Sequence, residues 1–458
     1  MKKAFKLVLL IILFFNSGLT TFAVNDPLSV ANNVFGIHIN NEKDFPEAVK
    51  LINSSGGDWG YVTFVITQEE RSIERWQGVF DQMRRLHIIP IVRIATKAFG
   101  DTWEIPNQEE IDTWVTFLNS LNWVIQNRYV VVLNEPNHAL EWGNKVDPEE
   151  YAQYLSRFAL ALHSASSDFF VLPAGFDATA QNTSNTMDES IFLKKMLIAV
   201  PDLFDYLDGW TSHSYPNPDF SGKETDMGRS SIGTFKWELD YLKTLGVTKD
   251  LPVFITETGW SNQKVEPEEI GNMYEYAFKN VWNDPKIVAV TPFILNYPQP
   301  PFTEFSWKDS GGNFYPYYPK VESIKKISGS PIQIISGKIL AAFAQPIIPY
   351  GSDYPGIILA KNTGQTIWNS DDVFVKGGTD DVDIKSFSFS EIEPNRLNLI
   401  VFKSTASNSI GIYSKSVKLE SSDGKDITNS FPIEALIVKI GKPQITSFIE
   451  KITRFFGF

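Results

Sequence analysis

Two glutamates stand at the ends of apolar, β-branched runs in this sequence. Val131–Asn137 reads Val-Val-Leu-Asn-Glu-Pro-Asn around Glu135, and Val253–Trp260 reads Val-Phe-Ile-Thr-Glu-Thr-Gly-Trp around Glu257. Apolar runs bounded by turn residues are typical of buried parallel strands, and a carboxylate at such a strand end has no role in packing. One such glutamate alone is as well explained as a solvated loop residue or as the partner of an arginine. Two of them supply what glycoside hydrolysis needs, which is one acid/base and one nucleophile or second base.

The residues around both glutamates resemble motifs of the clan A glycoside hydrolases. Leu133–Asn137 is similar to the Asn-Glu-Pro motif that ends the fourth barrel strand of that clan, and Ile255–Trp260 is similar to the nucleophile motif of its seventh strand. Between them, Trp210–Pro216 is similar to the His-x-Tyr motif of the sixth strand. The resemblance covers residues 30–327, and the 122-residue separation of the two glutamates leaves room for three strand–helix units. It points to cellulase- or xylosidase-like enzymes of this clan without singling out a family.

The resemblance implies a (β/α)₈ barrel enzyme that retains the anomeric configuration of its substrate. In such a barrel the active site lies at the C-terminal ends of the strands. The matched motifs imply Glu135 as the acid/base and Glu257 as the nucleophile. They also imply that Asn134 binds the 2-hydroxyl of the sugar and that Tyr215 orients Glu257. To donate a proton, Glu135 must be held neutral, which a nearby carboxylate and a partly dry cleft favour.

Other residues are candidates for substrate binding on their own pattern. Arg93 lies within an otherwise apolar run, and a buried cation needs a partner, either an active-site carboxylate or an ion pair elsewhere in the barrel. His213 is expected to point inward with Tyr215, where it either lines the cleft or supports it from behind. The aromatic residues that qualify as platforms for sugar faces are Trp142, Trp260, Tyr297 and Trp307. Any one of these rings is equally well explained by packing in the core.

Apolar runs and amphipathic stretches alternate along residues 30–327, which predicts a parallel sheet with helices between its strands. The predicted strands are Val34–His38, Tyr61–Val65, Ile88–Thr96, the run ending at Glu135, Phe169–Pro173, Leu207–Tyr215, the run ending at Glu257 and Ile287–Ile294. The predicted helices are Phe45–Ile52, Gln68–Leu86, Gln108–Val124, Pro148–His163, Thr234–Leu245 and Pro267–Val281. Eight strands in about 300 residues match the usual size of a (β/α)₈ barrel. The eighth run leads into Leu295-Asn296-Tyr297 where the clan has a tryptophan, and Trp307 is the candidate replacement.

From residue 330 onward, short apolar runs separated by Gly, Asn, Asp and Ser replace the helical pattern. This change predicts a small antiparallel β-sandwich over residues 330–440. Lys361–Trp368 resembles an Asn-Thr-Gly…Trp signature of Ig-like domains. The sandwich is interpreted either as a spacer or interaction module or as a carbohydrate-binding module. Residues 445–458 predict an amphipathic helix that either makes peripheral contact with a membrane or cell surface or caps the fold.

The first residues of the chain and its composition limit the class of protein to which it can belong. Met1-Lys2-Lys3, an apolar stretch and a small-residue site ending at Ala23 predict a secretory signal over residues 1–23, and so a secreted or cell-surface protein. Because the 458 residues include no Cys and 5 His, we expect no disulfide, no metal and no other cofactor. The net charge of −13 disfavours nucleic acid and is compatible with an oligo- or polysaccharide. A non-catalytic glycan-binding or cell-surface protein on the same scaffold is the alternative, and transglycosylation would use the same residues.

Overall fold

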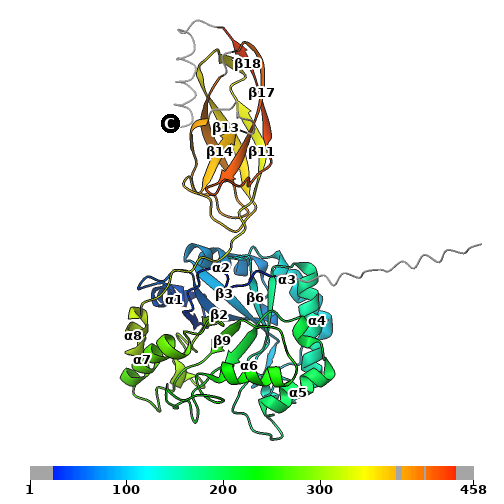
Figure 1. Cartoon of the computed structure of the whole chain (residues 1–458), viewed down its shortest axis with the longest axis vertical. Coiled ribbons are helices and arrows are strands. Elements are labelled where there is room, and N and C mark those ends of the chain that lie inside the picture. The colour runs from blue at the N-terminus through cyan, green and yellow to red at the C-terminus, as the bar shows by residue number, and fades with distance from the viewer. Residues whose placement is uncertain (1–23, 378–383, 407–408, 440–458) are drawn as a thin grey trace, which may run out of the picture.

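The computed structural model describes residues 24–377, 384–406 and 409–439 (Figure 1). Within them the apolar side chains form two large hydrophobic cores, one between Phe35 and Ile324 and the other between Ile339 and Ile437. The predicted export signal at 1–23 and the predicted amphipathic helix at 445–458 both lie outside the described residues. Of the helices in the described ranges, none is both long enough and apolar enough to cross a membrane.

The first core belongs to a mixed α/β unit in which strands and helices alternate, as predicted. Its parallel strands are β1 (Gly36–His38), β2 (Gly60–Thr67), β3 (Ile88–Ala95), β6 (Arg128–Val132), β7 (Phe169–Pro173), β8 (Trp210–His213), β9 (Val253–Glu257) and β10 (Ile287–Val290). Its helices are α1 (Phe45–Ile52), α2 (Ile73–Arg85), α3 (Ile111–Ser120), α4 (Pro148–Ala165), α5 (Glu189–Ala199), α6 (Thr234–Thr244), α7 (Pro267–Tyr276) and α8 (Tyr317–Ser323). All the predicted strands and helices are present, whereas α5 and α8 are additions, as is a short hairpin of β4 (Ala98–Phe99) and β5 (Thr102–Trp103).

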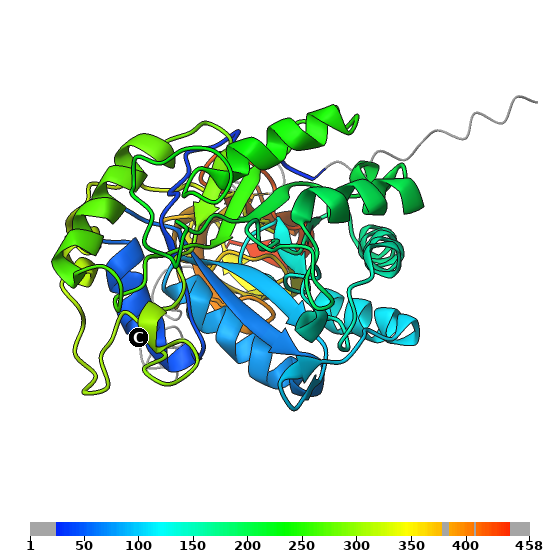
Figure 2. The ribbon, with the colours of Figure 1, turned by 90° about the horizontal axis from the view of Figure 1, so that it is seen from below.

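The parallel strands form two sheets whose edges meet. The five-stranded sheet has the order β1-β2-β3-β6-β7, and the three-stranded sheet has the order β10-β9-β8. Single parallel bridges join the sheets at both seams, Phe35 to Val290 beside β1 and Asp177 to His213 beside β8. The helices lie around the outside of these strands (Figure 2). The strands are buried along nearly their whole length, which explains why their sequences read as continuous apolar runs rather than as alternating ones.

Three of these helices, α2, α4 and α5, start at a capping side chain. Ser72 accepts a hydrogen bond from the backbone N–H of Arg75 at the start of α2, and Asp147 accepts one from Glu150 at the start of α4. The apolar face of α2 was predicted from its helical spacing. The residues of that face that are buried are Trp76, Val79, Phe80 and Met83. Packing of these faces against the sheets holds the strand ends in fixed positions.

A pair of acidic side chains is buried behind β8, between α5 and α6. Glu189 and Glu238 are fully buried, and Glu238 accepts from the indole N–H of Trp210 at 2.9 Å. Neither carboxyl oxygen of Glu189 has a hydrogen-bond partner within the described residues. Burial raises the pKa of Glu238 to about 6, and burial followed by the charge of Glu238 raises the pKa of Glu189 further.

We expect Glu189→Gln to stabilise the protein at pH 8, by ~1 kcal/mol or more, and to change its stability little near pH 4. The pKa of both groups is higher in the folded state than the unfolded value of 4.5. Their contribution to the stability of the fold is therefore complete below pH 4.5 and is lost as the pH rises through 6 and beyond. The glutamine keeps the shape of the side chain but cannot ionise. Urea unfolding at the two pH values measures this, with the exposed Glu149→Gln as control. An identical pH dependence in variant and parent would contradict it.

The second core lies between two four-stranded sheets, which fits the predicted β-sandwich. The strands are β11 (Gly337–Ala344), β12 (Ile347–Pro349), β13 (Asp353–Asn362), β14 (Val373–Gly377), β15 (Ile384–Ser388), β16 (Leu397–Thr405), β17 (Gly411–Ser421) and β18 (Phe431–Val438). The sheet orders are β11-β13-β16-β15 and β12-β18-β17-β14, and every pairing is antiparallel except that of β12 with β18. Trp368, the tryptophan of the Ig-like signature, is fully buried in this core.

The sandwich joins the α/β unit at one end, just before β3 and β6 begin (Figure 1). The side chain of Gln365 donates to the backbone oxygen of Ile125 at 2.7 Å, and Asn122 donates to the backbone oxygen of Gly364 at 2.9 Å. Arg85, the last residue of α2, forms an ion pair with Glu393 of the sandwich. The sandwich therefore contacts the α/β unit at the N-terminal ends of its strands.

Candidate active site

A cavity of about 380 Å³ lies at the C-terminal ends of the parallel strands. Arg93 reaches it from β3, His213 is the last residue of β8 and Glu257 is the last residue of β9, while Glu135 follows β6 by three residues. Parallel strands that end at the same edge bring residues far apart in the sequence into one place. The cavity therefore collects the two glutamates that the sequence singled out.

The backbone turns sharply where β6 ends. Leu133 has a φ of 73° and Glu135 a φ of 25°, a region that residues other than glycine rarely adopt. The backbone N–H of Glu135 donates to the carbonyl oxygen of Gly175 at 3.1 Å, which ties the turn to the loop that follows β7. Such a conformation costs ~1–3 kcal/mol per residue. The turn places the adjacent side chains of Asn134 and Glu135 in the same cavity, where both line the wall.

Glu257 is held as an ionised carboxylate. Its Oε1 accepts from Nη1 of Arg93 at 2.5 Å, and its Oε2 accepts from the hydroxyl of Tyr215 at 3.1 Å. Burial by itself would raise the pKa of Glu257, but the charges of His213 and Arg93 outweigh it and lower the pKa to about 2. A carboxylate in this state is free to act as a nucleophile at any ordinary pH.

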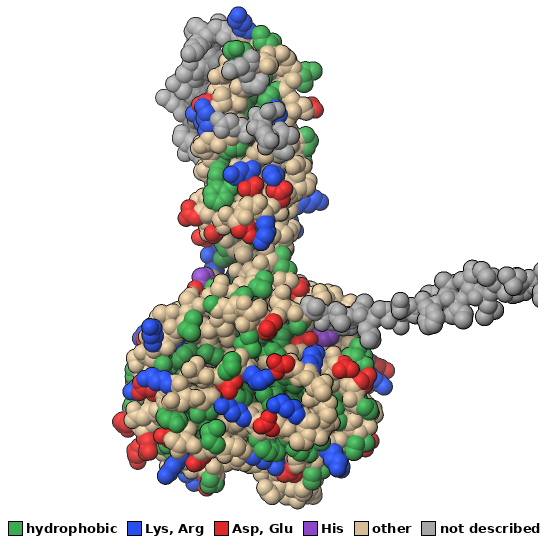
Figure 3. Space-filling model, viewed as in Figure 1, with side chains coloured by type: hydrophobic (Ala, Val, Ile, Leu, Met, Phe, Trp, Pro, Cys, Tyr) green, Lys and Arg blue, Asp and Glu red, His purple; other side chains and the backbone are tan. Residues whose placement is uncertain are grey.

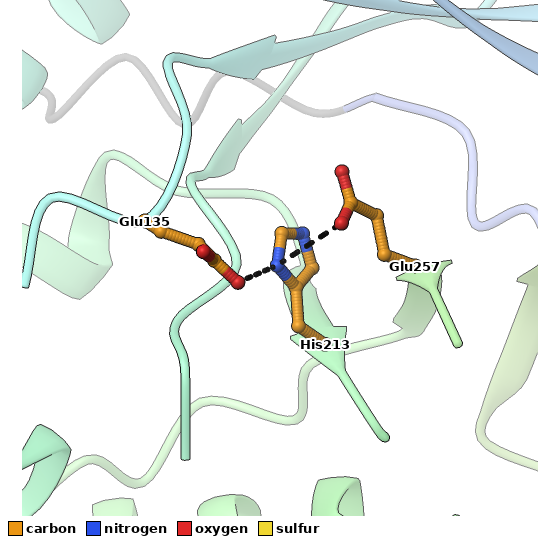
Figure 4. Close-up of side chains that lie close together, drawn as sticks. All are labelled: Glu135, His213 and Glu257. Atoms are coloured by element: carbon orange, nitrogen blue, oxygen red, sulfur yellow. Dashed lines mark hydrogen bonds and ion pairs between the residues drawn. The ribbon is translucent and has the colours of Figure 1, made fainter. Parts of the chain in front are cut away.

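His213 connects the two glutamates (Figure 4). Its Nδ1 lies 2.7 Å from Oε1 of Glu135 and 3.8 Å from Oε2 of Glu257. Although burial alone would lower the pKa of His213, the negative charges of Glu257 and Glu135 raise it above its ordinary value. A Cβ atom at Gly175 would lie 2.2 Å from the His213 ring, so only glycine at that position lets the ring occupy its place.

One ligand atom from each of Glu135, His213 and Glu257 lies within 4.8 Å of the others, a grouping that can also bind metal ions. Two features oppose that use here. Metal binding requires deprotonated ligands, and the raised pKa of His213 favours its protonated form. In addition, Arg93 already binds Oε1 of Glu257 and supplies the positive charge. The same grouping puts one carboxyl oxygen of Glu135 within 4.8 Å of one carboxyl oxygen of Glu257. The carboxyl groups of retaining glycosidases are ~5–5.5 Å apart and those of inverting ones ~6.5–9.5 Å apart.

The structure brings three of the other predicted residues, Arg93, His213 and Tyr215, into contact with the carboxylate pair. A fourth, Asn134, accepts a hydrogen bond from Arg93 and lines the same cavity. The partner of the Arg93 cation is Glu257, one of the two glutamates that the sequence singled out. Tyr297 lies beside the cavity and lines an adjoining hollow.

The aromatic platforms predicted at Trp260 and Trp307 need correction. Both rings are buried in the first core and neither lines the cavity. The indole N–H of Trp260 donates to the backbone oxygen of Gly222, and its ring packs edge-on against Tyr274. Trp142 is buried in the same way. These rings stabilise the fold and present no face to a ligand.

Several cavity residues were not predicted. Glu141 and Asp177 add two carboxyl groups to the wall, and His138 pairs with Asp177 at 2.9 Å. The rings that line the cavity are Trp103, Phe220, Phe293, Phe302 and Phe305. Most of these residues lie on loops after strand ends, so the rule that singled out the two glutamates would have found them if extended by about ten residues beyond each strand.

His38, the last residue of β1, is a further residue that the sequence did not mark as part of the site. It is buried, it lines the adjoining hollow, and neither ring nitrogen has a hydrogen-bond partner within the described residues. Burial, followed by the positive charge of Arg93, lowers the pKa of His38 to about 3, so the ring is neutral. A buried, unsatisfied imidazole is costly unless a bound molecule supplies its partner.

No family model matches the chain, and no curated protein matches it. Solved structures with a similar fold include a family 39 glycoside hydrolase from the gut symbiont Bacteroides cellulosilyticus WH2, at 13% identity and TM-score 0.46 over 83% of this chain and 82% of that chain. They also include GH5_18 from Streptomyces cattleya in complex with GlcNAc, at 13% identity and TM-score 0.47 over 70% and 85%. A third is the exo-beta-1,4-mannosidase Op5Man5 from Opitutaceae bacterium strain TAV5, at 13% identity and TM-score 0.44 over 66% and 60%. All three scores lie below 0.5, so the function of this chain has to be inferred from its own site.

We expect Arg93→Met to move the acid limb of the pH–activity profile to higher pH. The charge of Arg93 lowers the pKa of Glu257, so its loss lets that pKa rise, and a larger fraction of Glu257 is then protonated at low pH. Arg93→Lys keeps the charge and is the matched control, and its limb should move less. The measurement is kcat/KM between pH 3 and 8. If the acid limb of Arg93→Met coincides with that of the parent, the charge of Arg93 does not set the pKa of Glu257.

Proposed function

We propose that this chain is a retaining glycoside hydrolase that cleaves β-linked glycans by double displacement. The observation that carries the proposal is that the two neighbouring carboxyl groups have different hydrogen-bond partners. Arg93 and Tyr215 both donate to Glu257, whereas Glu135 has the His213 ring beside it. Two carboxyl groups whose surroundings differ in this way can divide the roles of nucleophile and acid/base. The β preference comes from the clan that the motifs resemble.

The reaction follows from these positions. Glu257 attacks the anomeric carbon while Glu135 gives its proton to the glycosidic oxygen, so the bond to the leaving sugar breaks and a glycosyl ester forms on Glu257. Glu135, now a carboxylate, takes a proton from a water molecule as that water attacks the same carbon. The ester bond breaks, the sugar leaves with its original configuration and both glutamates return to their starting states.

The shape of the cleft favours an oligo- or polysaccharide substrate. The catalytic cavity adjoins a second hollow of about 450 Å³, and the two share wall residues. The shared residues are Val65, Arg93, Trp103, Phe293 and Phe302. The aromatic rings among them offer apolar surface to the faces of pyranose rings at the point where the two hollows meet. On the face shown in Figure 3, acidic and basic side chains are interspersed, which suits a neutral glycan better than a polyanion.

The alternative is an exported protein that binds glycans without cleaving them. A binding protein has no need of a carboxylate whose pKa is held at about 2 beside a second carboxyl group, because the cost of burying both charges brings no gain in affinity. Transglycosylation remains a second outcome of the same mechanism, in which a sugar rather than water takes the place of the incoming nucleophile.

We also propose the organisation that the sequence indicates. Residues 30–327 would form a (β/α)₈ barrel that contains the whole active site, and residues 330–440 would form an Ig-like sandwich that contributes no catalytic group. The two seam bridges and the separate cores support this division. Residues 1–23 would direct export, giving a secreted or cell-surface enzyme, and residues 445–458 would provide peripheral contact with that surface.

The test of the proposed function is the anomer released first. Purified protein is incubated with aryl β-glycosides and β-linked oligosaccharides, and proton NMR follows the product before mutarotation. We expect the β-anomer, since an oxygen of Glu135 lies within 4.8 Å of an oxygen of Glu257, a spacing closer to that of retaining than of inverting enzymes. Release of the α-anomer would overturn the mechanism, and the absence of cleavage of any glycoside would favour the binding protein.

A further inference from the structure

Apolar side chains gather at the end of the β-sandwich that lies farthest from the α/β unit. At this end β11, β12, β16 and β18 finish and β13 and β17 begin (Figure 1). Six of its large apolar side chains, which we call the tip, are between 42% and 84% exposed: Phe343, Ile347, Tyr350, Ile410, Ile412 and Leu436. Exposed apolar side chains that gather in one place mark an interaction surface, because leaving them in water brings a folded domain no gain.

The tip residues come from both sheets of the sandwich and from the loops between the sheets. Ile347 and Ile412 lie on either side of Leu436, and the strand register pairs each of them with it. Phe343 lies on β11 of the other sheet. The two remaining tip residues lie in the loops after β12 and before β17. Apolar surface therefore covers several sides of this end and does not form one flat patch.

The described chain ends at the tip. The backbone N–H of Tyr350 donates to the carbonyl oxygen of Val438 at 3.0 Å, and Lys439 is the last described residue. The 19 residues that follow, 440–458, include the segment whose sequence predicts an amphipathic helix. The segment proposed to touch a surface is thus attached to the sandwich beside the apolar tip.

A lipid bilayer suits the tip better than a glycan or a rigid protein does. Sugars pack on flat aromatic rings, whereas four of the six tip residues are isoleucine or leucine. A rigid partner covers one face, but a fluid bilayer surrounds an end that is apolar on several sides. Asp353, at the start of β13, forms ion pairs with Lys385 at 2.9 Å and with Lys403 at 3.4 Å. This carboxylate therefore brings no uncompensated charge to the bilayer surface.

We propose that the tip inserts its apolar side chains into the surface of a lipid bilayer and, together with the segment beyond Lys439, holds the protein on a membrane. Peripheral binding strengthens with the apolar area that is buried, so two apolar elements at one end of the molecule bind more tightly than either alone. The proposal goes beyond the glycosidase reaction and does not depend on it. Its tests use no glycan, so their outcome is separate from that of the proposed function.

The first test is flotation with phosphatidylcholine vesicles. The protein lacks residues 1–23, because their apolar stretch would itself bind lipid. We expect the parent to float with the vesicles, and Phe343→Ser/Ile412→Ser to lower the partition coefficient about tenfold or more, since two exposed side chains no longer enter the bilayer. The matched control is Leu397→Ser/Ile198→Ser, which should float like the parent. Both control side chains are more than half exposed, and they lie at the other end of the sandwich and on α5.

Four results of the flotation would overturn the proposal. They are equal flotation of the parent and the tip variant, an equal loss in the control variant, no binding of the parent, and binding only to vesicles that contain anionic phosphatidylglycerol. The last result would assign the contact to charge. If the parent binds no vesicle but forms a dimer in sedimentation that the tip variant does not form, the tip is an interface between two copies of the chain.

The second test measures the depth of single positions. The chain has no Cys, so Ile412→Cys and Leu397→Cys each accept one nitroxide spin label. When vesicles are added, the label at position 412 should become more accessible to oxygen, which concentrates in the bilayer, and less accessible to a water-soluble nickel chelate. The label at position 397 should not change. If the label at position 412 stays in water while the protein floats, the segment beyond Lys439 binds alone and the proposal is overturned.

Discussion

Replacing Glu257 by alanine should abolish turnover, with a loss on the order of 10⁴-fold or more, the range typical of removing a covalent nucleophile. No other carboxylate in the cavity combines its ionisation with contact to both Arg93 and Tyr215. The loss should appear in kcat for every substrate, because the glycosyl ester cannot form without the Glu257 oxygen. Steady-state kinetics on an activated aryl β-glycoside measure it, with the exposed Glu149→Ala as control for handling and folding.

Azide decides whether the lost group was a nucleophile. The shortened side chain leaves space beside the anomeric carbon, and an azide ion in that space can displace the aglycone directly. Only one displacement then occurs, so the product should be the α-glycosyl azide. If azide restores no turnover, or if the product keeps the β configuration, Glu257 is not the nucleophile.

Replacing Glu135 by alanine should slow the substrates with poor leaving groups the most, by ~10²–10⁴-fold. A poor leaving group needs a proton as its bond to the sugar breaks, whereas a dinitrophenolate leaves without one. With the activated substrate, formation of the glycosyl ester should be nearly normal. Its hydrolysis should be slow, because no base is left to take the proton of the attacking water.

A plot of log kcat/KM against leaving-group pKa for the parent and for Glu135→Ala tests this division of roles. We expect a much steeper dependence in the variant, together with a burst of released phenolate on the best substrate. Glu135→Gln is the second variant, since it can keep a contact with His213. An equal slowing across all leaving groups would remove Glu135 from the acid/base role.

The strands and the two glutamates were predictable because a parallel strand that is buried on both faces has a recognisable sequence pattern. A parallel strand under helices reads as an unbroken apolar run, so a carboxylate at its end stands out in one sequence. Arg93 stands out for the same reason, as a cation within such a run. The helix α5 does not stand out, because its apolar residues do not keep to one face, and Ile191 and Ile198 among them are exposed.

The aromatic platforms were not predictable, because the identity of a ring says nothing about which way it faces. Trp260 follows Glu257 by three residues, and the turn after β9 carries its ring into the core against Tyr274. Phe293 and Phe302, which carry no polar atom to mark them, line the cavity instead. Glu141 escaped notice because its place depends on the path of a loop, which neither a period of two nor one of 3.6 describes.

The attachment of the sandwich just before β3 and β6 has a consequence for an enzyme fixed to a surface. Glu135 and Glu257 lie beyond the other end of β6, whose five residues span about 17 Å. If the sandwich or the chain beyond it is the tether, the mouth of the cleft opens toward the medium and not toward the support. A tethered molecule oriented in this way would draw soluble chains from the surroundings and release its products outward, and the polymer to which it is attached would stay out of reach of its own active site.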